Sequence, residues 1–119
     1  MDIAGMIAEV RRHPEFHKAG MLLAHNGVVR ATSRDGRGVK GLRVGVDHRR
    51  LEQILAEQRK RPGIIDIRVA IAEDRDLSVG DDVMILIVAG DIRENVIAVL
   101  TDTLNLIKTT VTAKTEYFV

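Results

Sequence analysis

Seven consecutive apolar residues, Val83 to Ala89 (VMILIVA), constrain the fold of this chain more than any other segment. A strand with one face in water alternates apolar and polar residues, whereas a strand covered on both faces is apolar throughout. The run is also too short to cross a bilayer. We therefore predict a central strand that is covered on both faces and entered through a turn at residues 80–82 (GDD).

The segments around this strand alternate between helical and extended patterns. Apolar residues recur at helical spacing in three segments, and alternation or β-branched residues mark four others. The predicted helices are Asp2–Arg12 and Asp47–Arg61, each capped by its aspartate, and a longer helix from Asp91 to Ile107; the predicted strands are Gly20–Arg30, Val39–Val46, Ile64–Ala72 and Thr109–Val119. This order predicts an α+β fold in which helices pack on a mostly antiparallel sheet.

Length and composition limit the number of domains and the compartment. A chain of 119 residues with 45% apolar content suffices for one hydrophobic core, so residues 1–119 are predicted to form a single domain. No apolar stretch is long enough to cross a membrane, and Asp2 and Glu9 interrupt the segment where a secretory signal needs an apolar run. We expect a cytoplasmic protein with no membrane partner.

The absence of cysteine excludes several kinds of chemistry. The chain can form no disulfide, no thiolate metal site and no persulfide, so any sulfur chemistry must bring its sulfur on a partner. The only closely spaced histidines, His13 and His17, are separated by Pro14 and lack an acidic third ligand. We therefore expect no metal site and no cofactor.

The net charge of +1 conceals an uneven distribution along the chain. Residues 28–61 contain ten Lys or Arg and four Asp or Glu, whereas residues 62–107 contain three and nine. The basic segment favours an anionic ligand, such as a phosphorylated small molecule, an acidic protein or a nucleic acid. Because the chain has only three aromatic residues, it lacks the stacking platform of single-strand binders, and we expect no nucleic-acid partner.

The candidate binding residues are mostly cations at the ends of predicted elements. Arg30 closes the first strand, Arg93 lies in the first turn of the long helix, and Lys108 ends that helix with Lys114 six residues further on. Helix N-termini and loops at strand ends favour anions. A solvated surface position is the alternative for each of them, and Lys108 could simply complement the helix dipole.

Two further candidates lie on the first strand and on the loop after it. His25 interrupts an apolar strand, which indicates either a half-buried, hydrogen-bonded imidazole or a proton carrier. The loop 32–38 (TSRDGRG) contains Arg34 and resembles an anion-binding turn, although it lacks the Gly-Lys-Ser/Thr ending of a P-loop.

Three further segments follow one another at a defined spacing. Gly20 to Arg30 ends in Val-Val-Arg, ten residues after its glycine. Residues 77–93 (LSVGDDVMILIVAGDIR) contain a Gly-Asp turn, an apolar strand and a closing arginine, and Ile107-Lys108-Thr109 follows with its lysine fifteen residues after that arginine. Taken together, these segments resemble the large (catalytic) subunit of molybdopterin synthase, and the resemblance covers roughly residues 20–116.

The resemblance implies a fold, a reaction and partners. The fold would be the α/β hammerhead of that family. A ubiquitin-like small subunit would deliver sulfur as a C-terminal thiocarboxylate, and the large subunit would transfer it to cyclic pyranopterin monophosphate, forming molybdopterin. The large subunits of the family form a central dimer that carries two small subunits, which implies a homodimer within a heterotetramer.

The resemblance also implies roles for single residues. Lys108 would be the central catalytic lysine, which contacts the partner's C-terminus and activates the pterin, and Lys114 the second lysine. Arg30 and Arg93 would bind the substrate phosphate, for which guanidinium groups are suited. His25 and Arg34 complete the predicted substrate-binding set.

The sequence departs from the family at several positions. Ile92 stands where a histidine usually precedes the arginine of the long helix, and Lys114 follows Lys108 by six residues where seven are usual. His25 stands where an aromatic residue is common. The alternative function is therefore a non-catalytic relative that binds a pterin, another phosphorylated metabolite or the tail of a ubiquitin-like partner.

Overall fold

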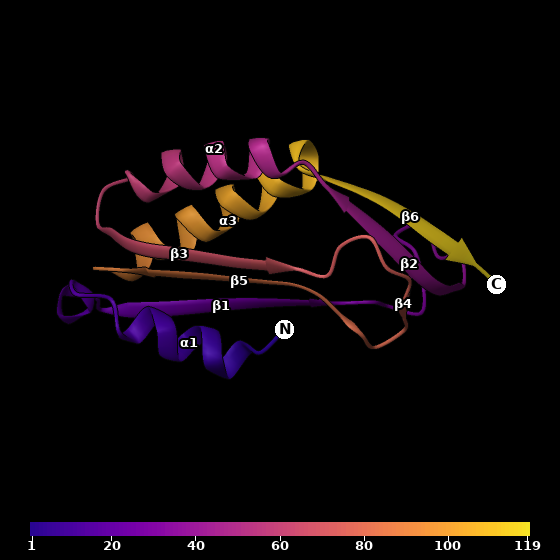
Figure 1. The fold of residues 1–119 in the computed structure, drawn as a ribbon, viewed down its shortest axis with the longest axis horizontal. Helices are drawn as coiled ribbons and strands as arrows, with labels where there is room; N and C mark the ends of the chain where they lie inside the picture. Colours follow the sequence, from indigo (N-terminus) through magenta and orange to yellow (C-terminus); the bar gives the residue numbers. More distant parts are fainter.

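A computed structural model describes residues 1–119 and contains two antiparallel sheets of three strands each (Figure 1). The strand orders are β1-β5-β3 and β4-β2-β6, and every strand pairing is antiparallel. The elements are α1 (Ile3–Arg11), a 3-10 turn (Phe16–Lys18), β1 (Met21–Val28), β2 (Val39–Val46), α2 (His48–Arg59), β3 (Ile64–Ile71), β4 (Leu77–Ser78), β5 (Asp82–Gly90), α3 (Arg93–Thr110) and β6 (Thr112–Phe118). The predicted α+β class is confirmed. None of the helices is long and apolar enough to span a membrane.

The prediction of a central strand covered on both faces is confirmed by β5. This strand lies between β1 and β3, and its residues 84–89 are all buried. Met84, Leu86 and Val88 pack into a cluster with residues of α2 and α3, whereas Ile85 and Ile87 pack against Val10 of α1. Figure 1 shows α2 and α3 over one face of this sheet and α1 under the other. Burial of both faces explains why the segment has no polar position.

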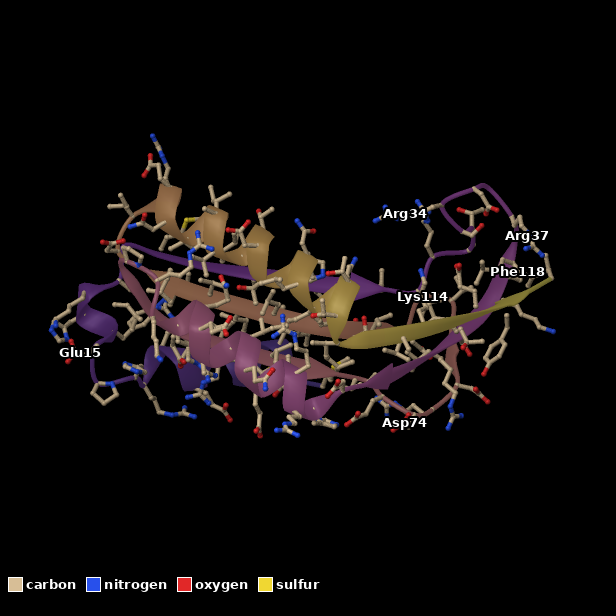
Figure 2. All side chains as sticks on the ribbon, turned by 90° about the horizontal axis from the view of Figure 1, so that it is seen from above. Glu15, Arg34, Arg37, Asp74, Lys114 and Phe118 are labelled. Carbon is tan, nitrogen blue, oxygen red and sulfur yellow. The ribbon has the colours of Figure 1, made fainter.

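The second sheet was not predicted as a separate unit. β2 and β6 leave the helices and run to the end of the molecule where Arg37 and Phe118 lie, as the turned view of Figure 2 shows. A smaller cluster of Val29, Leu42, Val44, Ala72 and Leu77 packs against this sheet. Alternation of apolar and polar residues predicted β2 but not its partner, and β4, with two residues, is too short to leave a periodic signal.

Several predicted boundaries differ from the structure by one to three residues. β1 ends at Val28 instead of Arg30, α3 begins at Arg93 and extends to Thr110, and the last strand starts only at Thr112. α2 ends at Arg59, two residues before the predicted end. Ends of elements depend on caps and local bonds that periodicity does not report.

The two predicted aspartate caps had different outcomes. The Asp47 carboxylate accepts a hydrogen bond from the backbone N–H of Arg50 at 3.1 Å, as predicted for the start of α2. Asp2 occupies the N-cap position of α1, but its side chain makes no capping hydrogen bond. Asp2 therefore marks the start of the helix without satisfying one of its free N–H groups.

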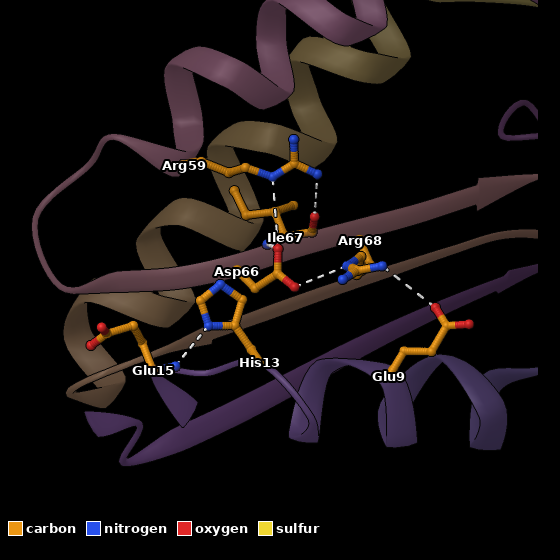
Figure 3. Close-up of polar contacts among 7 residues, drawn as sticks. All are labelled: Glu9, His13, Glu15, Arg59, Asp66, Ile67 and Arg68. Atoms are coloured by element: carbon orange, nitrogen blue, oxygen red, sulfur yellow. Dashed lines mark hydrogen bonds and ion pairs between the residues drawn. The ribbon is translucent and has the colours of Figure 1, made fainter. Parts of the chain in front are cut away.

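β3 carries a polar pair, Asp66 and Arg68, on the face of the first sheet that packs against α1. Asp66 and Arg68 pair across the ladder with Ala89 and Ile87 of β5, whose side chains face α1. The Asp66 side chain is only 8% exposed and accepts a hydrogen bond from Arg68 Nε at 2.9 Å. Arg68 continues to Glu9 of α1 at 3.5 Å (Figure 3).

A second arginine reaches Asp66 from α2. Arg59 Nε lies 3.8 Å from Asp66 Oδ1, and its terminal nitrogen donates to the Ile67 carbonyl at 2.7 Å. This ion-pair network joins α2, β3 and α1 along the outer edge of the first sheet (Figure 3). Charged groups in this place also discourage the edge strand from pairing with another chain.

Asp66→Ala is expected to lower the free energy of unfolding by about 1–3 kcal/mol, because it leaves Arg68 and Arg59 without their shared carboxylate. Urea unfolding measures the change. The control is Glu94→Ala, which removes an exposed ion pair with Arg93 and is expected to cost at most about 0.5 kcal/mol. Equal effects of the two variants would contradict a stabilising role for the network.

Candidate functional site

A cavity of about 350 Å³ lies where the two sheets meet. Its lining comes from β1, the loop after β1, β2, the ends of β3 and α3, and the starts of β5 and β6. Four of the six predicted site residues line this cavity: His25, Arg34, Lys108 and Lys114. They come from four separate segments of the chain. The junction of the two sheets therefore brings them together.

Lys114 is directed to the cavity by the register of the second sheet. It pairs with Val44 of β2, and paired residues in an antiparallel ladder project from the same face. Val44 is buried in the wall of the cavity, and Thr112, two residues before Lys114, lines it as well. The Lys114 side chain is 52% exposed and lies 4.0 Å from Glu116, a loose contact that leaves the ammonium available.

Lys108 reaches the same cavity from the last turn of α3. Only Val111 separates the helix from β6, and its N–H donates to the Ile107 carbonyl at 3.0 Å. This tight turn sends the chain from the helix end directly along the cavity wall. Lys108 forms no ion pair, and its position in the last turn of α3 places its charge at the negative end of the helix dipole.

His25 lies opposite these lysines on β1. It pairs with Leu86, whose side chain faces α2 and α3, so the imidazole projects from the same face of the first sheet as α3. Partial burial lowers the pKa of His25 below its ordinary value of 6.5, and the charge of Lys108 lowers it further. A neutral imidazole in the cavity can accept a proton or a hydrogen bond.

Arg34 extends over the cavity from the tip of the loop between β1 and β2. Figure 2 shows it projecting from this loop toward the end of α3, on the side where the Lys114 amino group lies. It makes no hydrogen bond or ion pair with the rest of the chain. The lining thus contains three cationic side chains and no carboxylate.

Arg30 and Arg93 do not line the cavity. The Arg30 Nε donates to the Thr32 carbonyl at 2.8 Å, at the base of the loop that carries Arg34. Arg93 begins α3, fifteen residues before Lys108, which places the two about 22 Å apart along the helix. Its side chain is 79% exposed and paired with Glu94. Within one chain, Arg93 therefore cannot share a ligand with the lysines.

Sequence reasoning missed the small and apolar part of the site. Thr112 lies on the cavity face and has a hydroxyl for hydrogen bonding, and the period of two from Lys114 was the signal that could have found it. Val28, Leu42 and Ile71 supply an apolar wall, which could not be placed without the strand partners. The cavity combines this wall with a cationic rim, and so can accept a flat ligand that carries an anionic group.

No group of three or more His, Asp or Glu side chains is arranged to hold a metal ion. The chemical groups that the cavity offers are two primary amines, a guanidinium, a neutral imidazole and a hydroxyl. Such a set can bind an anion, activate a carbonyl or imine carbon through an amine, and move a proton through the imidazole.

Solved structures from several bacteria have the same fold. Molybdopterin cofactor biosynthesis protein E from Burkholderia multivorans ATCC 17616 matches with a TM-score of 0.78 and 24% identity over 100% of this chain and 84% of that one. Molybdopterin synthase from Staphylococcus aureus matches with a TM-score of 0.72 and 21% identity over 86% and 77%. A complex of subunits 1 and 2 of molybdopterin-converting factor from Helicobacter pylori 26695 matches with a TM-score of 0.72 and 14% identity over 99% and 84%.

These likenesses identify the fold as that of the molybdopterin synthase large subunits. No curated protein matches the sequence significantly. The family model described as MoaE protein matches residues 1–110, a range that includes Lys108 and ends before Lys114. The chain therefore belongs to the MoaE protein family, and this membership supports a role in molybdenum cofactor biosynthesis.

His25 is expected to titrate below pH 6.5 in the folded protein, because burial and Lys108 both disfavour the imidazolium. Since the folded pKa is the lower one, the His25 contribution to stability is complete above the unfolded value near 6.5 and is lost as pH falls through the folded pKa. Imidazole NMR signals followed against pH measure the midpoint.

Lys108→Met is expected to raise this midpoint while leaving it below 6.5, since burial is the larger of the two causes. Lys60→Met, which removes an exposed charge at the end of α2, is the control and is expected to leave the midpoint unchanged. A midpoint at or above 6.5 in the unsubstituted protein would refute the placement of His25 in a desolvated cavity.

Proposed function

We propose that this chain is the large subunit of a molybdopterin synthase, which transfers sulfur from a thiocarboxylated, ubiquitin-like small subunit to cyclic pyranopterin monophosphate. The observation that carries the proposal is the convergence of Lys108, Lys114, Arg34 and His25 on one cavity with a cationic rim. Membership of the MoaE family supports the same reaction.

The charges of the cavity suit both reactants. The substrate carries a phosphate and the small subunit ends in a negatively charged thiocarboxylate, so each gains from a rim with three cations and no carboxylate. The apolar wall formed by Val44, Met84 and their neighbours suits the flat pterin ring. Both reactants can therefore be held against each other with little competing repulsion.

Each polar side chain has a separate task in this reaction. Lys108 contacts the C-terminus of the small subunit and activates the pterin carbon that the sulfur attacks. Lys114 stabilises the negative charge that develops as the sulfur attacks, and Arg34 binds the phosphate as a guanidinium fork. Attack by the thiocarboxylate sulfur leaves an acyl–sulfur bond to the small subunit, and His25, neutral in the cavity, accepts a proton from the water molecule that hydrolyses this bond.

Arg93 can take part only in the cavity of a second copy of the chain. It lies about 22 Å from Lys108 along α3, yet it begins a helix beside two exposed apolar residues, Ile92 and Ile97, which are 53% and 47% exposed. Contact with a second copy of the chain would remove these two apolar side chains from water. A homodimer within a heterotetramer would bury them and carry Arg93 to the partner copy.

A non-catalytic binder is the second candidate function. Ile92 can neither donate nor accept a hydrogen bond, at a position where the family usually has histidine. With isoleucine at position 92, His25 is the histidine that lines the cavity. The binder and the synthase both predict affinity for the small subunit and for the pterin phosphate, but only the synthase predicts product.

Reconstitution separates these two functions. The purified chain, a thiocarboxylated small subunit and cyclic pyranopterin monophosphate are expected to give dithiolene product. Lys108→Ala is expected to lower the rate at least about 100-fold, as loss of an acid–base group does. Lys60→Ala, outside the cavity, is expected to keep the rate. Binding of both reactants without product would establish the binder.

Mixing two inactive variants tests the shared site. Arg93→Ala and Lys108→Ala chains, each homogeneous, are expected to form defective dimers, whereas mixed dimers contain one cavity with both residues intact. Random mixing in equal amounts is therefore expected to recover about a quarter of the wild-type activity. The matched control mixes Lys108→Ala with Lys114→Ala, both cavity residues of the same chain. If the two mixtures behave alike, Arg93 does not act across the dimer.

A further inference from the structure

The loop that carries Arg34 is held by backbone hydrogen bonds, by the Ser33 side chain and by an aromatic contact. The Ala31 carbonyl accepts from the Val39 N–H at 2.8 Å, Thr32 and Gly38 form a β-bridge, and the Ser33 N–H donates to the Arg37 carbonyl at 2.8 Å. These contacts close residues 31–39 into a narrow hairpin with Arg34, Asp35 and Gly36 at its tip. Gly36 has a φ of 87°, a conformation that suits glycine.

Ser33 fixes the tip of this hairpin from inside. It is only 7% exposed although its neighbours on the loop lie in solvent. Its hydroxyl accepts a hydrogen bond from the Arg37 N–H at 3.1 Å and donates one to the Asp35 carboxylate, which lowers the pKa of Asp35. The carboxylate next to Arg34 is thus turned toward the loop itself.

The hairpin is anchored to the second sheet through an aromatic ring. The guanidinium carbon of Arg37 lies 3.6 Å from the centre of the Phe118 ring, a stacked cation–π contact. Phe118 is the last residue of β6 and pairs with Val39, the first residue of β2, so the ring lies beside the base of the hairpin. The N–H of Val119 adds a hydrogen bond to the Gly38 carbonyl at 3.1 Å.

This anchor belongs to the same strand as Lys114. Phe118 and Lys114 are four residues apart on β6, so they project from the same face of the second sheet. Figure 2 shows Arg37 and Phe118 together at the far end of that sheet, with Arg34 reaching back from the hairpin. One strand therefore sets the position of Lys114 and, through Phe118 and Arg37, the position of Arg34.

We propose that Phe118 and Arg37 are positioning residues, which hold the 31–39 hairpin in place so that Arg34 stays over the cavity to bind an anionic group. The proposal rests on the proposed function in that Arg34 faces the substrate phosphate there. The stack does not touch the ligand. The contact between Arg37 and Phe118 restricts the motion of the hairpin, so that less conformational entropy is lost when Arg34 binds the anion.

Amide exchange tests whether the stack holds the hairpin. Phe118→Leu keeps an apolar side chain but removes the ring, and it is expected to speed exchange at Ser33 and Arg37, whose N–H groups form the internal bonds of the hairpin. Phe118→Tyr keeps the ring and is expected to behave as the unsubstituted protein. Tyr117→Leu, at the adjacent position of β6 on the opposite face, controls for general loosening of the strand. Equal exchange in the Phe118→Leu and unsubstituted proteins would overturn the proposal.

Binding of inorganic phosphate tests whether the hairpin positions Arg34. Arg34→Ala is expected to weaken phosphate binding about tenfold, and Phe118→Leu about two- to fivefold, the range that a surface cation–π contact supports. In the Arg34→Ala background, Phe118→Leu is expected to have no further effect, since its influence passes through Arg34.

Additive effects of the two substitutions, or no phosphate binding by the unsubstituted chain, would overturn the positioning role. Neither readout requires turnover. Failure of the hairpin proposal is therefore distinguishable from failure of the synthase reaction, which is decided by product in the reconstitution. If the synthase is active but the effects of Arg34→Ala and Phe118→Leu on phosphate binding are additive, only the positioning role of Phe118 and Arg37 is refuted.

Discussion

The structure depends on the burial of β5 on both faces. Its side chains alternate between the cluster under α2 and α3 and the cluster over α1, so one strand supplies the core to both layers of helices. Desolvation of so many apolar groups is the largest favourable term in a fold of this size. Because β5 also pairs with β1 and β3, the place where it begins sets where the first sheet ends and the cavity starts.

The cavity results from the way in which the second sheet leaves the first. β1 and the start of β5 supply one wall, β2 and β6 the other, and the end of α3 adds Lys108 between them. Apolar side chains pack together at this junction, while Arg34, Lys108 and Lys114 remain exposed. The cations thus keep most of their hydration, which limits the cost of placing three of them around one space without a carboxylate.

The elements that were predicted correctly from the sequence are those that depend on the local pattern of apolar and polar residues. The apolar run identified the central strand, and the Asp47 cap and the period of α3 placed two helices. The sequence did not predict that the strands form two sheets, since the partner of β2 is chosen by packing between segments that are distant in the chain. The same limit applies to the site: four of six candidates meet in the cavity, whereas Arg30 and Arg93 had equally good local signals and lie elsewhere.

The single-residue joint between α3 and β6 makes the sequence spacing of the two lysines an unreliable measure of their geometry. Lys108 belongs to the helix and Lys114 to the strand, so their separation in space depends on where the helix unwinds. A chain whose helix ended one residue later would need its second lysine one residue later to present it from the same face of the sheet. A spacing of six residues in this chain can therefore give the same arrangement of amines as a spacing of seven after a helix that ends one residue later. The residue at which α3 ends is therefore a better reference for the position of the second lysine than the number of residues between the two lysines.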